Sequence, residues 1–293
     1  MRVRKAVIPA AGLGTRLLPA SKSVPKEMIP LVDRPAIQYV VEECVRAGIR
    51  DILIVTGRGK ATMEDHFDRS LELEERLEKS GKAEELEEVR RVAAMAAVHY
   101  VRQKEALGLG HAVGTARDHV GDEPFAVLLP DEIVPAPLGD EPPLLERMVE
   151  MHERDGASVV AVRRVPHERV SAYGIVATEG DPVDDFVKVS DLVEKPAPAD
   201  APSDLGAVGR YILGPEIFEA IDATAPGAGG EIQLTDGIRA LVGSPGVYAY
   251  VHGGPIYDVG KRLDYVKGTV QLALRRDDLG PPLKAWLRDV LDG

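Results

Sequence analysis

A glycine-rich turn followed by two cations is the part of the chain best suited to hold phosphate. Gly12 and Gly14 follow the apolar run 6–11, which is typical of a short buried strand. Glycine has no Cβ, so a polyphosphate can approach the backbone N–H groups of such a turn closely. Arg16 offers a planar fork of donors and Lys26 a mobile point charge, and both suit phosphate oxygens. This order predicts a site for a nucleoside triphosphate.

Two commoner glycine loops do not fit this turn. No Lys-Ser or Lys-Thr pair follows at the offset that a P-loop requires. A dinucleotide fingerprint needs a third glycine where this chain has Leu17. Because G-x-G after a strand is a weak signal by itself, the prediction depends on the whole string through Pro25 and Lys26.

Two aspartates stand where they could hold a metal ion. Asp131 directly follows the buried run 127–130, and Asp258 follows the strand-like run 247–251. Magnesium takes oxygen ligands, usually one or two carboxylates together with substrate phosphates. A strand-end aspartate can equally cap a helix or close a turn, so the residues alone leave both interpretations open. Glu132 adjoins Asp131 but would point to the other side of an extended chain, so we do not include it in the predicted site.

Six stretches in chain order resemble the sugar-nucleotide pyrophosphorylases, and among them the bacterial enzymes that use UTP and glucose 1-phosphate. They are residues 7–16, 24–28, 108–112, 193–196, 208–211 and 230–236, and together they span nearly the whole chain. The resemblance implies an enzyme that transfers UMP from UTP to α-D-glucose 1-phosphate and gives UDP-glucose and pyrophosphate. The sugar phosphate would attack the α-phosphorus of UTP in line.

The resemblance also implies which residues carry the reaction. Asp131 and Asp258 match metal ligands, so Mg²⁺ is the expected cofactor. Arg16 and Lys26 would hold the triphosphate and the leaving pyrophosphate, while Lys195 would steady the sugar phosphate. A phosphate monoester is already largely dianionic at neutral pH, so no general base is required. What the reaction needs is the alignment and screening of two anions that repel each other.

Substrate recognition is assigned in the same way. Glu194 matches a residue that binds sugar hydroxyls, although an acid beside a base is more commonly a surface pair. Tyr173 and Gly174 match a turn that contacts the sugar, and Gln103 with the backbone of Gly108 matches positions that read the nucleobase edge. The predicted substrate-binding residues are Ala11, Gly12, Gly14, Thr15, Glu27, Gln103, Gly108, Tyr173, Gly174, Glu194 and Gly209.

Two alternatives stay open at this stage. The nucleotide or sugar could differ, as in enzymes that make dTDP-glucose or CDP-glucose. A non-catalytic paralogue could bind sugar nucleotides and regulate a partner, although such a protein should have lost a cation or a metal ligand.

The remaining histidines, among them His66, His99 and His252, show no ligand-like spacing and are interpreted as structural.

Composition limits the partners. A formal net charge of −12 over 293 residues argues against nucleic acid, which requires a basic face. The single cysteine, Cys44, excludes an intrachain disulfide and shares one helical face with apolar residues, which favours core packing. Residues 1–5 lead directly into a strand too short for a signal peptide, and no apolar stretch approaches about 20 residues. We therefore expect a soluble cytoplasmic protein with no membrane partner.

The elements that must position these residues alternate along the chain. Apolar runs without strict alternation imply strands covered on both faces, which predicts an α/β, doubly wound fold with ligands at the carboxyl ends of the strands. Strands are expected at 6–11, 51–56, 125–129, 158–165, 187–193 and 247–251, and helices at 35–47, 144–154, 215–220 and 232–241.

The resemblance turns this pattern into one Rossmann-like nucleotidyltransferase domain over residues 1–293, with a mostly parallel mixed sheet. Residues 1–135 would form the nucleotide half, 136–260 the sugar-phosphate half, and 261–293 a C-terminal helical segment broken at 280–282. The charged stretch 64–91 predicts a solvated helical hairpin. Residues 135–143 and 196–202 are expected to be loops. The resemblance also suggests a homodimer or a homotetramer.

Overall fold

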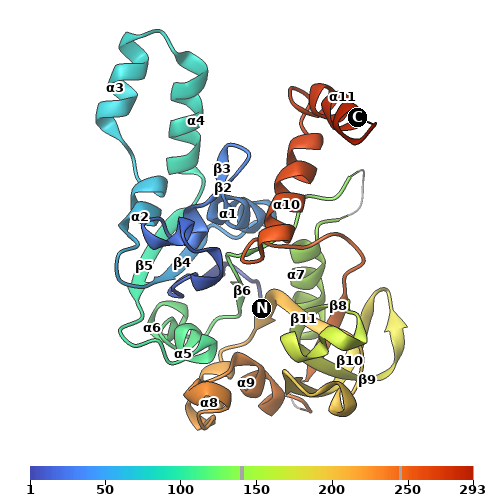
Figure 1. Cartoon of the computed structure of the whole chain (residues 1–293). Helices are drawn as coiled ribbons and strands as arrows, with labels where there is room; N and C mark the ends of the chain where they lie inside the picture. The colour runs from blue at the N-terminus through green and yellow to red at the C-terminus, as the bar shows by residue number, and fades with distance from the viewer. Residues whose placement is uncertain (139–141, 244–245, 293) are drawn as a thin grey trace.

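One mixed sheet of nine strands runs through the middle of the protein (Figure 1). The computed structural model describes residues 1–138, 142–243 and 246–292. In sheet order the strands are β5 (Ala97–Arg102), β4 (Asp51–Thr56), β1 (Lys5–Pro9), β6 (Phe125–Leu128), β11 (Leu205–Leu213), β8 (Ser158–Arg164), β12 (Val247–Val251), β10 (Phe186–Glu194) and β9 (Gly174–Val183).

Parallel pairing is confined to two parts of this sheet. Strands β5, β4, β1 and β6 run parallel to one another, and β12 runs parallel to β8. The other neighbours, from β6 to β11 to β8 and from β12 to β10 to β9, are antiparallel. The expected mixed α/β sheet is confirmed, but the expectation of a mostly parallel one is wrong, because parallel and antiparallel neighbours are equally frequent in the order of the described strands. Its parallel part carries the glycine turn.

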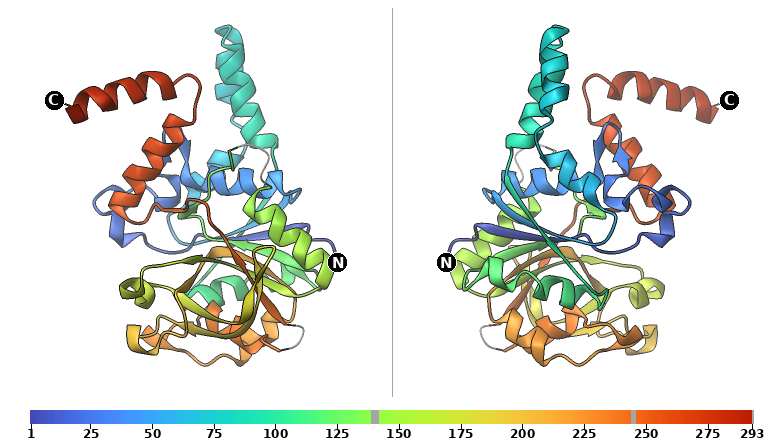
Figure 2. Two further views of the ribbon diagram at one scale, coloured as in Figure 1. Left: turned by 90° about the vertical axis from the view of Figure 1, so that its right-hand side faces the viewer. Right: turned by 90° about the vertical axis from the view of Figure 1, so that its left-hand side faces the viewer.

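Helices cover both faces of the sheet, as a doubly wound fold requires (Figure 2). One face packs against α1 (Ala36–Arg46), α2 (Ala61–Phe67) and α7 (Leu144–Asp155). The other packs against α5 (Leu109–Gly114), α6 (Arg117–Val120), α8 (Ile217–Ala223) and α9 (Leu234–Ala240). Cys44 of α1 is fully buried in the first of these layers, so its predicted packing role is confirmed.

Two helical pairs extend from this body (Figures 1 and 2). The hairpin of α3 (Leu71–Lys79) and α4 (Ala83–Ala94) confirms the expected charged hairpin, and Glu74 within it accepts bonds from both Arg69 and Arg90. At the C-terminus, α10 (Arg262–Leu274) is followed by α11 (Gly280–Asp292). The predicted break at 280–282 is misplaced: the chain leaves the helix after Leu274, and Gly280 opens the next one, where proline is tolerated in the first turn.

Two short antiparallel pairs complete the fold. The first joins β7 (Glu132–Ile133) to β13 (Tyr257–Asp258), and the second joins β2 (Pro30–Leu31) to β3 (Arg34–Pro35). Residues 196–202 form a loop as expected, whereas part of the predicted loop 135–143 lies outside the described residues. Among the described helices, none combines the length and the apolar character needed to cross a membrane.

Candidate active site

The glycine turn leaves the carboxyl end of β1, where ligands are expected in an α/β sheet. Gly14 has a φ of 67°, and a Cβ added there would lie 3.0 Å from Cβ of Lys26. Glycine is therefore required at this position both for its conformation and for the close approach of Lys26. Thr15 and Arg16 follow directly in a 3-10 turn, Thr15–Leu17. The turn thus places Arg16 and Lys26 on the same side of the sheet edge.

A buried lysine that the sequence analysis overlooked anchors this turn. The ammonium group of Lys60 donates hydrogen bonds to the backbone oxygens of Ala10 and Gly12, the latter at 2.8 Å. It also donates to both carboxylate oxygens of Glu27, at 3.0 and 2.9 Å. Burial raises the pKa of Glu27 and lowers that of Lys60, while each charge opposes the shift of the other. Two segments distant in sequence are thereby fixed to one cation.

The direction of the Lys60 bonds determines where the amides of the turn point. In a trans peptide the carbonyl and the following N–H point in opposite directions. Because the carbonyls of Ala10 and Gly12 face Lys60, the N–H groups of Ala11 and Leu13 point away from it. Such outward amides are suited to an anionic ligand. Glu27, predicted to bind substrate, is fully buried on Lys60 and turns its carboxylate inward.

The two predicted metal ligands come together through the small β7–β13 sheet. Asp258 pairs in register with Glu132, the neighbour of Asp131, and the N–H of Val259 donates to the carbonyl of Asp131 at 2.8 Å. The guanidinium of Arg16 lies 3.4 Å from Asp131 Oδ2 and 3.5 Å from Asp258 Oδ2. One arginine therefore contacts two carboxylates that lie far apart in the sequence.

Lysines complete the charge balance around these carboxylates. Lys26 Nζ lies 2.6 Å from Asp131 Oδ2, and Lys261 Nζ lies 2.8 Å from Asp258 Oδ2. Burial opposes the ionisation of Asp131, but the charge and hydrogen bond of Lys26, with the charge of Arg16, outweigh it and lower the pKa of that carboxyl. Asp131 is therefore an anion at neutral pH. The cluster combines hard oxygen donors with cations suited to phosphate.

The residues predicted to bind the sugar phosphate form a second group beside the first. Glu194 Oε2 accepts a hydrogen bond from Thr235 Oγ1 at 2.7 Å, and Glu194 Oε1 lies 2.9 Å from Lys195 Nζ. A Cβ on Gly174 would lie 3.1 Å from Thr235 Oγ1 and 3.2 Å from Glu194 Oε2, so glycine keeps this place open. Lys195 itself has a φ of 45°, a conformation uncommon for a residue with a side chain and one found at binding sites.

A single cavity of about 420 Å³ joins the two groups, within the size range of small-molecule sites. Its walls include Leu109, Leu129, Tyr211 and Gln233 as well as charged residues. Seven of its lining residues belong to the predicted site: Arg16, Asp131, Tyr173, Gly174, Glu194, Lys195 and Asp258. Glu132, which we expected to point away, also lines it, and its Oε2 accepts the N–H of Gly209 at 3.1 Å.

The remaining predicted residues lie outside this cavity. Gln103 is nearly buried and donates to the carbonyl of Gly108 at 3.2 Å, with its Nε2 also 2.8 Å from His111 Nδ1. Gly209 packs directly on Leu129, where a Cβ would come within 2.5 Å of the leucine side chain. Those that are not among the lining residues are Ala11, Gly12, Gly14, Thr15, Lys26, Glu27, Gln103, Gly108 and Gly209.

Three polar residues of the site, Lys60, Lys261 and Thr235, were not predicted from the sequence. Lys60 follows the expected strand 51–56 and belongs to none of the six stretches that carry the resemblance. Lys261 stands three residues after Asp258, and its Nζ lies 5.5 Å from the Tyr173 ring centroid. Thr235 lies within residues 230–236, one of the stretches that carry the family resemblance, and that resemblance is the sequence feature that could have indicated a role for it. A lone lysine has no spacing rule, and its partners become visible only in the fold.

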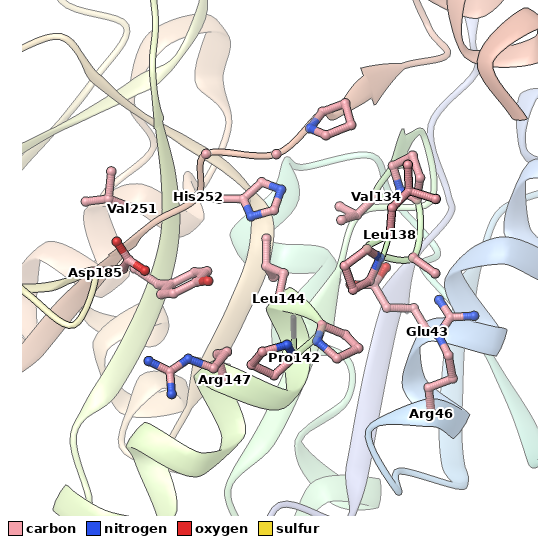
Figure 3. A pocket seen from close by; sticks show the side chains of 18 of the residues that line it. Glu43, Arg46, Val134, Leu138, Pro142, Leu144, Arg147, Asp185, Val251 and His252 are labelled. Atoms are coloured by element: carbon pink, nitrogen blue, oxygen red, sulfur yellow. The ribbon is translucent and has the colours of Figure 1, made fainter. Parts of the chain in front are cut away.

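A larger hollow of about 940 Å³ lies on another part of the surface (Figure 3). Its lining includes residues 134–138, Arg46, Arg147 and His252. The carboxylate of Glu43 on its wall is already bound by Arg210. The cavity that joins the two groups, rather than this larger one, brings together carboxylates and lysines that a phosphorylated ligand would require.

Comparison with known proteins extends the likeness over nearly the whole chain. The family model described as nucleotidyl transferase matches residues 5–274. A UTP–glucose-1-phosphate uridylyltransferase of Bacillus subtilis (strain 168) is 49% identical over 290 residues, covering 99% of this chain and 96% of that protein. One from Streptococcus pneumoniae serotype 4 is 48% identical, covering 98% of this chain and 95% of that protein.

Solved structures show the same likeness in the fold. A structure described as UTP-bound UGPase from Acinetobacter baumannii has a TM-score of 0.90 at 42% identity, covering 97% of this chain and 98% of that one. Another, described as UDP-glucose pyrophosphorylase complexed with UDP-glucose, has a TM-score of 0.84 at 40% identity, covering 94% of this chain and 100% of that one. The backbone that positions the two groups is therefore similar in these proteins.

Proposed function

This chain belongs to the nucleotidyl transferase family, and from that premise we propose that it transfers UMP from UTP to α-D-glucose 1-phosphate. The products are UDP-glucose and pyrophosphate. One observation carries the proposal: a single cavity holds the acidic cluster of Asp131 and Asp258 beside Glu194 and Lys195. Two anionic substrates can thus meet between two sets of cations.

We propose that the two halves of the chain divide the substrates. Residues 1–135 hold UTP, with outward amides of the glycine turn, Arg16 and Lys26 on the triphosphate. Residues 136–260 hold the sugar phosphate, with Lys195 on its phosphate and Glu194 on sugar hydroxyls. The Glu194 carboxylate is oriented for this by Thr235. Gln103, whose Nε2 bonds Gly108 and His111, presents its Oε1 as an acceptor for the base.

The reaction follows from this arrangement. A phosphate oxygen of glucose 1-phosphate attacks the α-phosphorus of UTP, a new P–O bond forms, and the bond to the β-phosphate breaks. The leaving pyrophosphate takes the electron pair. No proton transfer is needed at the nucleophile, because the second pKa of a phosphate monoester is near 6 and the group is already largely dianionic at neutral pH. Arg16 and Lys26 neutralise the leaving group, while Lys195 aligns the attacking phosphate. Catalysis therefore depends on position and charge.

Asp131 and Asp258 fit a divalent cation, and we propose Mg²⁺. Their oxygens are hard donors, they come from two segments that the β7–β13 pair joins, and both face Arg16. When bound, the cation would offset the negative charge that the two phosphates bring together. Lys26 and Lys261, which neutralise these carboxylates in this structure, would then be free to contact phosphate oxygens.

Pyrophosphate release from glucose 1-phosphate tests the proposal. We expect release with UTP and Mg²⁺, and its loss with EDTA, when UTP, dTTP, CTP, ATP and GTP are compared. Preference for another nucleotide would support the same transfer reaction but with a different nucleobase in the substrate. The absence of release with every nucleotide, from protein that still binds UDP-glucose, would support the non-catalytic regulatory alternative.

Lys60 provides a separate prediction for the glycine turn. Lys60→Met should raise the KM for UTP by roughly 10- to 100-fold, because the turn loses the cation that directs its amides. Steady-state kinetics against UTP measures this effect. The control is Lys60→Met with Glu27→Gln, which removes the buried unpaired carboxylate. Normal kinetics in that double variant would assign Lys60 to stability alone.

We also propose that the chain forms a homodimer or homotetramer through its C-terminal helices. Leu263 and Val266 on α10, and Trp286 and Val290 on α11, are more than half exposed in the single chain. Covering such side chains is favourable at about 25 cal/mol per Å². Light scattering of Trp286→Ser should report a smaller species than the parent chain, and an unchanged mass would exclude this surface.

A cytoplasmic location is the last part of the proposal. It rests on the substrates, since UTP and glucose 1-phosphate are supplied by metabolism within the cell. Fractionation of cells that produce the chain tests it, and recovery outside the cytoplasmic fraction would contradict it.

A further inference from the structure

Two histidines and an aspartate meet at the opposite end of the strands from the candidate active site. Asp51 is the first residue of β4, His99 lies on β5 and His119 lies on α6. From the sequence, His99 is expected to be structural, because no ligand spacing connects it to another histidine. The fold supplies the connection that the spacing lacks.

Strand register explains why these side chains share a face. Asp51 pairs with Ala97 and Leu53 pairs with His99 in the parallel β4–β5 ladder. Side chains two residues apart point to the same face, so Asp51, Leu53 and His99 lie on one side. Leu53 belongs to the apolar layer that includes Val120 of α6. The helix that carries His119 therefore covers the face from which Asp51 and His99 project.

The distances bring all three donor atoms to one point. His119 Nε2 lies 2.8 Å from Asp51 Oδ1, and His99 Nε2 lies 3.7 Å from the same oxygen. One ligand atom from each residue lies within 4.8 Å of the other two. The imidazole rings are 4.9 Å apart between centroids, with an angle of 52° between their planes. The two Nε2 atoms thus converge on one carboxylate.

From this geometry we propose that Asp51, His99 and His119 bind a divalent transition-metal ion, Zn²⁺ in particular. Two imidazoles and a carboxylate are a donor set that zinc accepts, with bonds of about 2.0–2.2 Å and water in the fourth position. Such bond lengths separate tetrahedral ligand atoms by roughly 3.3–3.5 Å, close to the distances found here. Magnesium prefers oxygen ligands alone, so this site and the proposed catalytic one differ in selectivity.

Neighbouring charges leave the donors available. Lys5 is the nearest cation on β1, but its ammonium donates to the backbone oxygens of His119 and Val120 and pairs with Glu123 at 2.8 Å. It therefore holds the α6 backbone and is directed away from the imidazole. Arg50, beside Asp51, donates to the carbonyl of Met95. Among the described residues, the groups that contact the Asp51 carboxylate are the two histidines.

A bound ion would join three elements. β5 is the edge strand of the sheet, and α6 is a short helix on its surface. The ion would connect both to β4, so it is a structural site, and it lies away from the carboxyl ends where the cavity opens. We therefore expect zinc to raise the unfolding temperature without being required for turnover.

Zinc titration of the full chain tests the proposal. Calorimetry with UTP and excess Mg²⁺ present, so that the proposed active site is occupied, should find one zinc per chain. His99→Ala and His119→Ala should each weaken that binding by at least about 10- to 100-fold, as expected for loss of a contact to the metal. His99 is half exposed, so its replacement tests the site without disturbing the core.

A matched control comes from the His167–Asp204 pair. His167 Nδ1 lies 2.9 Å from Asp204 Oδ1, with no third ligand grouped with them among the described residues. His167→Ala should leave zinc binding and the zinc-dependent rise in unfolding temperature unchanged. Co²⁺ should give visible absorption bands in the parent chain and lose them in His119→Ala. Equal zinc affinity in the parent and both histidine variants, or no binding at all, would overturn the proposal.

Discussion

Asp131→Asn is expected to lower turnover by at least about 10²–10³ while the protein stays folded. The carboxylate is the point where Lys26, Arg16 and the proposed metal meet, and asparagine keeps its shape but removes its charge. The lost charge weakens cation binding, so the Mg²⁺ concentration for half-maximal rate should also rise. Pyrophosphate release measured across Mg²⁺ concentrations reports both effects.

The control for this variant is another aspartate that an arginine binds. Asp191 accepts two hydrogen bonds from Arg239, at 2.6 and 2.9 Å, and lies outside the cavity. Asp191→Asn should therefore keep normal turnover and normal Mg²⁺ dependence. Near-normal activity in folded Asp131→Asn would refute the assignment of Asp131 as a metal ligand.

Arg210→Met should destabilise the protein by about 3–5 kcal/mol, the usual cost of leaving a buried charge without its partner. Arg210 is fully buried, and its guanidinium binds both carboxylate oxygens of Glu43 at 2.9 and 2.8 Å. Its other donors go to the carbonyls of Leu129, Gly209 and Glu132, at 3.2, 2.8 and 2.7 Å. All five N–H groups thus have acceptors.

The carbonyls of Leu129 and Glu132 lie on either side of Asp131 in the chain, so Arg210 connects stability to the site. We expect the unfolding temperature of Arg210→Met to fall by about 10 °C. Turnover should also fall at temperatures where the variant is still folded. Thermal unfolding and kinetics at 20 °C separate the two effects. Arg239→Met, which breaks an exposed pair, should cost less than about 1 kcal/mol. Equal losses of folding stability in Arg210→Met and Arg239→Met would show that the burial of Arg210 does not increase the cost of its removal.

The sequence predicts well those strands that contain an uninterrupted apolar run. β4 and β12 match their expected bounds, and β6 and β8 differ by one residue at an end. The central strand β11 was not predicted because Gly206, Gly209 and Arg210 interrupt its apolar run. Its arginine is acceptable in the core only because Glu43, far away in the chain, is buried opposite it. Strand β9 was missed for a different reason: half of it is exposed and polar.

The candidate site could be predicted in part for a similar reason. Arg16, Lys26, Asp131 and Asp258 lie at strand ends or in a glycine turn, where local pattern and chemistry agree. The fold brings them together, as the prediction of one site requires. Lys60 was not found, because its importance comes from the backbone oxygens and the carboxylate around it. Contacts between distant segments leave no mark in local spacing.

The pairing of β7 with β13 also sets when the protein can become active during translation. A nascent chain emerges from the ribosome amino end first, at about 5–20 residues per second. The glycine turn and Asp131 are synthesised early, whereas Asp258 and β12, the strand inserted between β8 and β10, come last. The nucleotide half must therefore wait on the order of ten seconds for its second carboxylate. Until then a growing chain lacks half of the proposed metal site and the strand between β8 and β10, so we expect catalysis to begin only after residue 258 has left the ribosome.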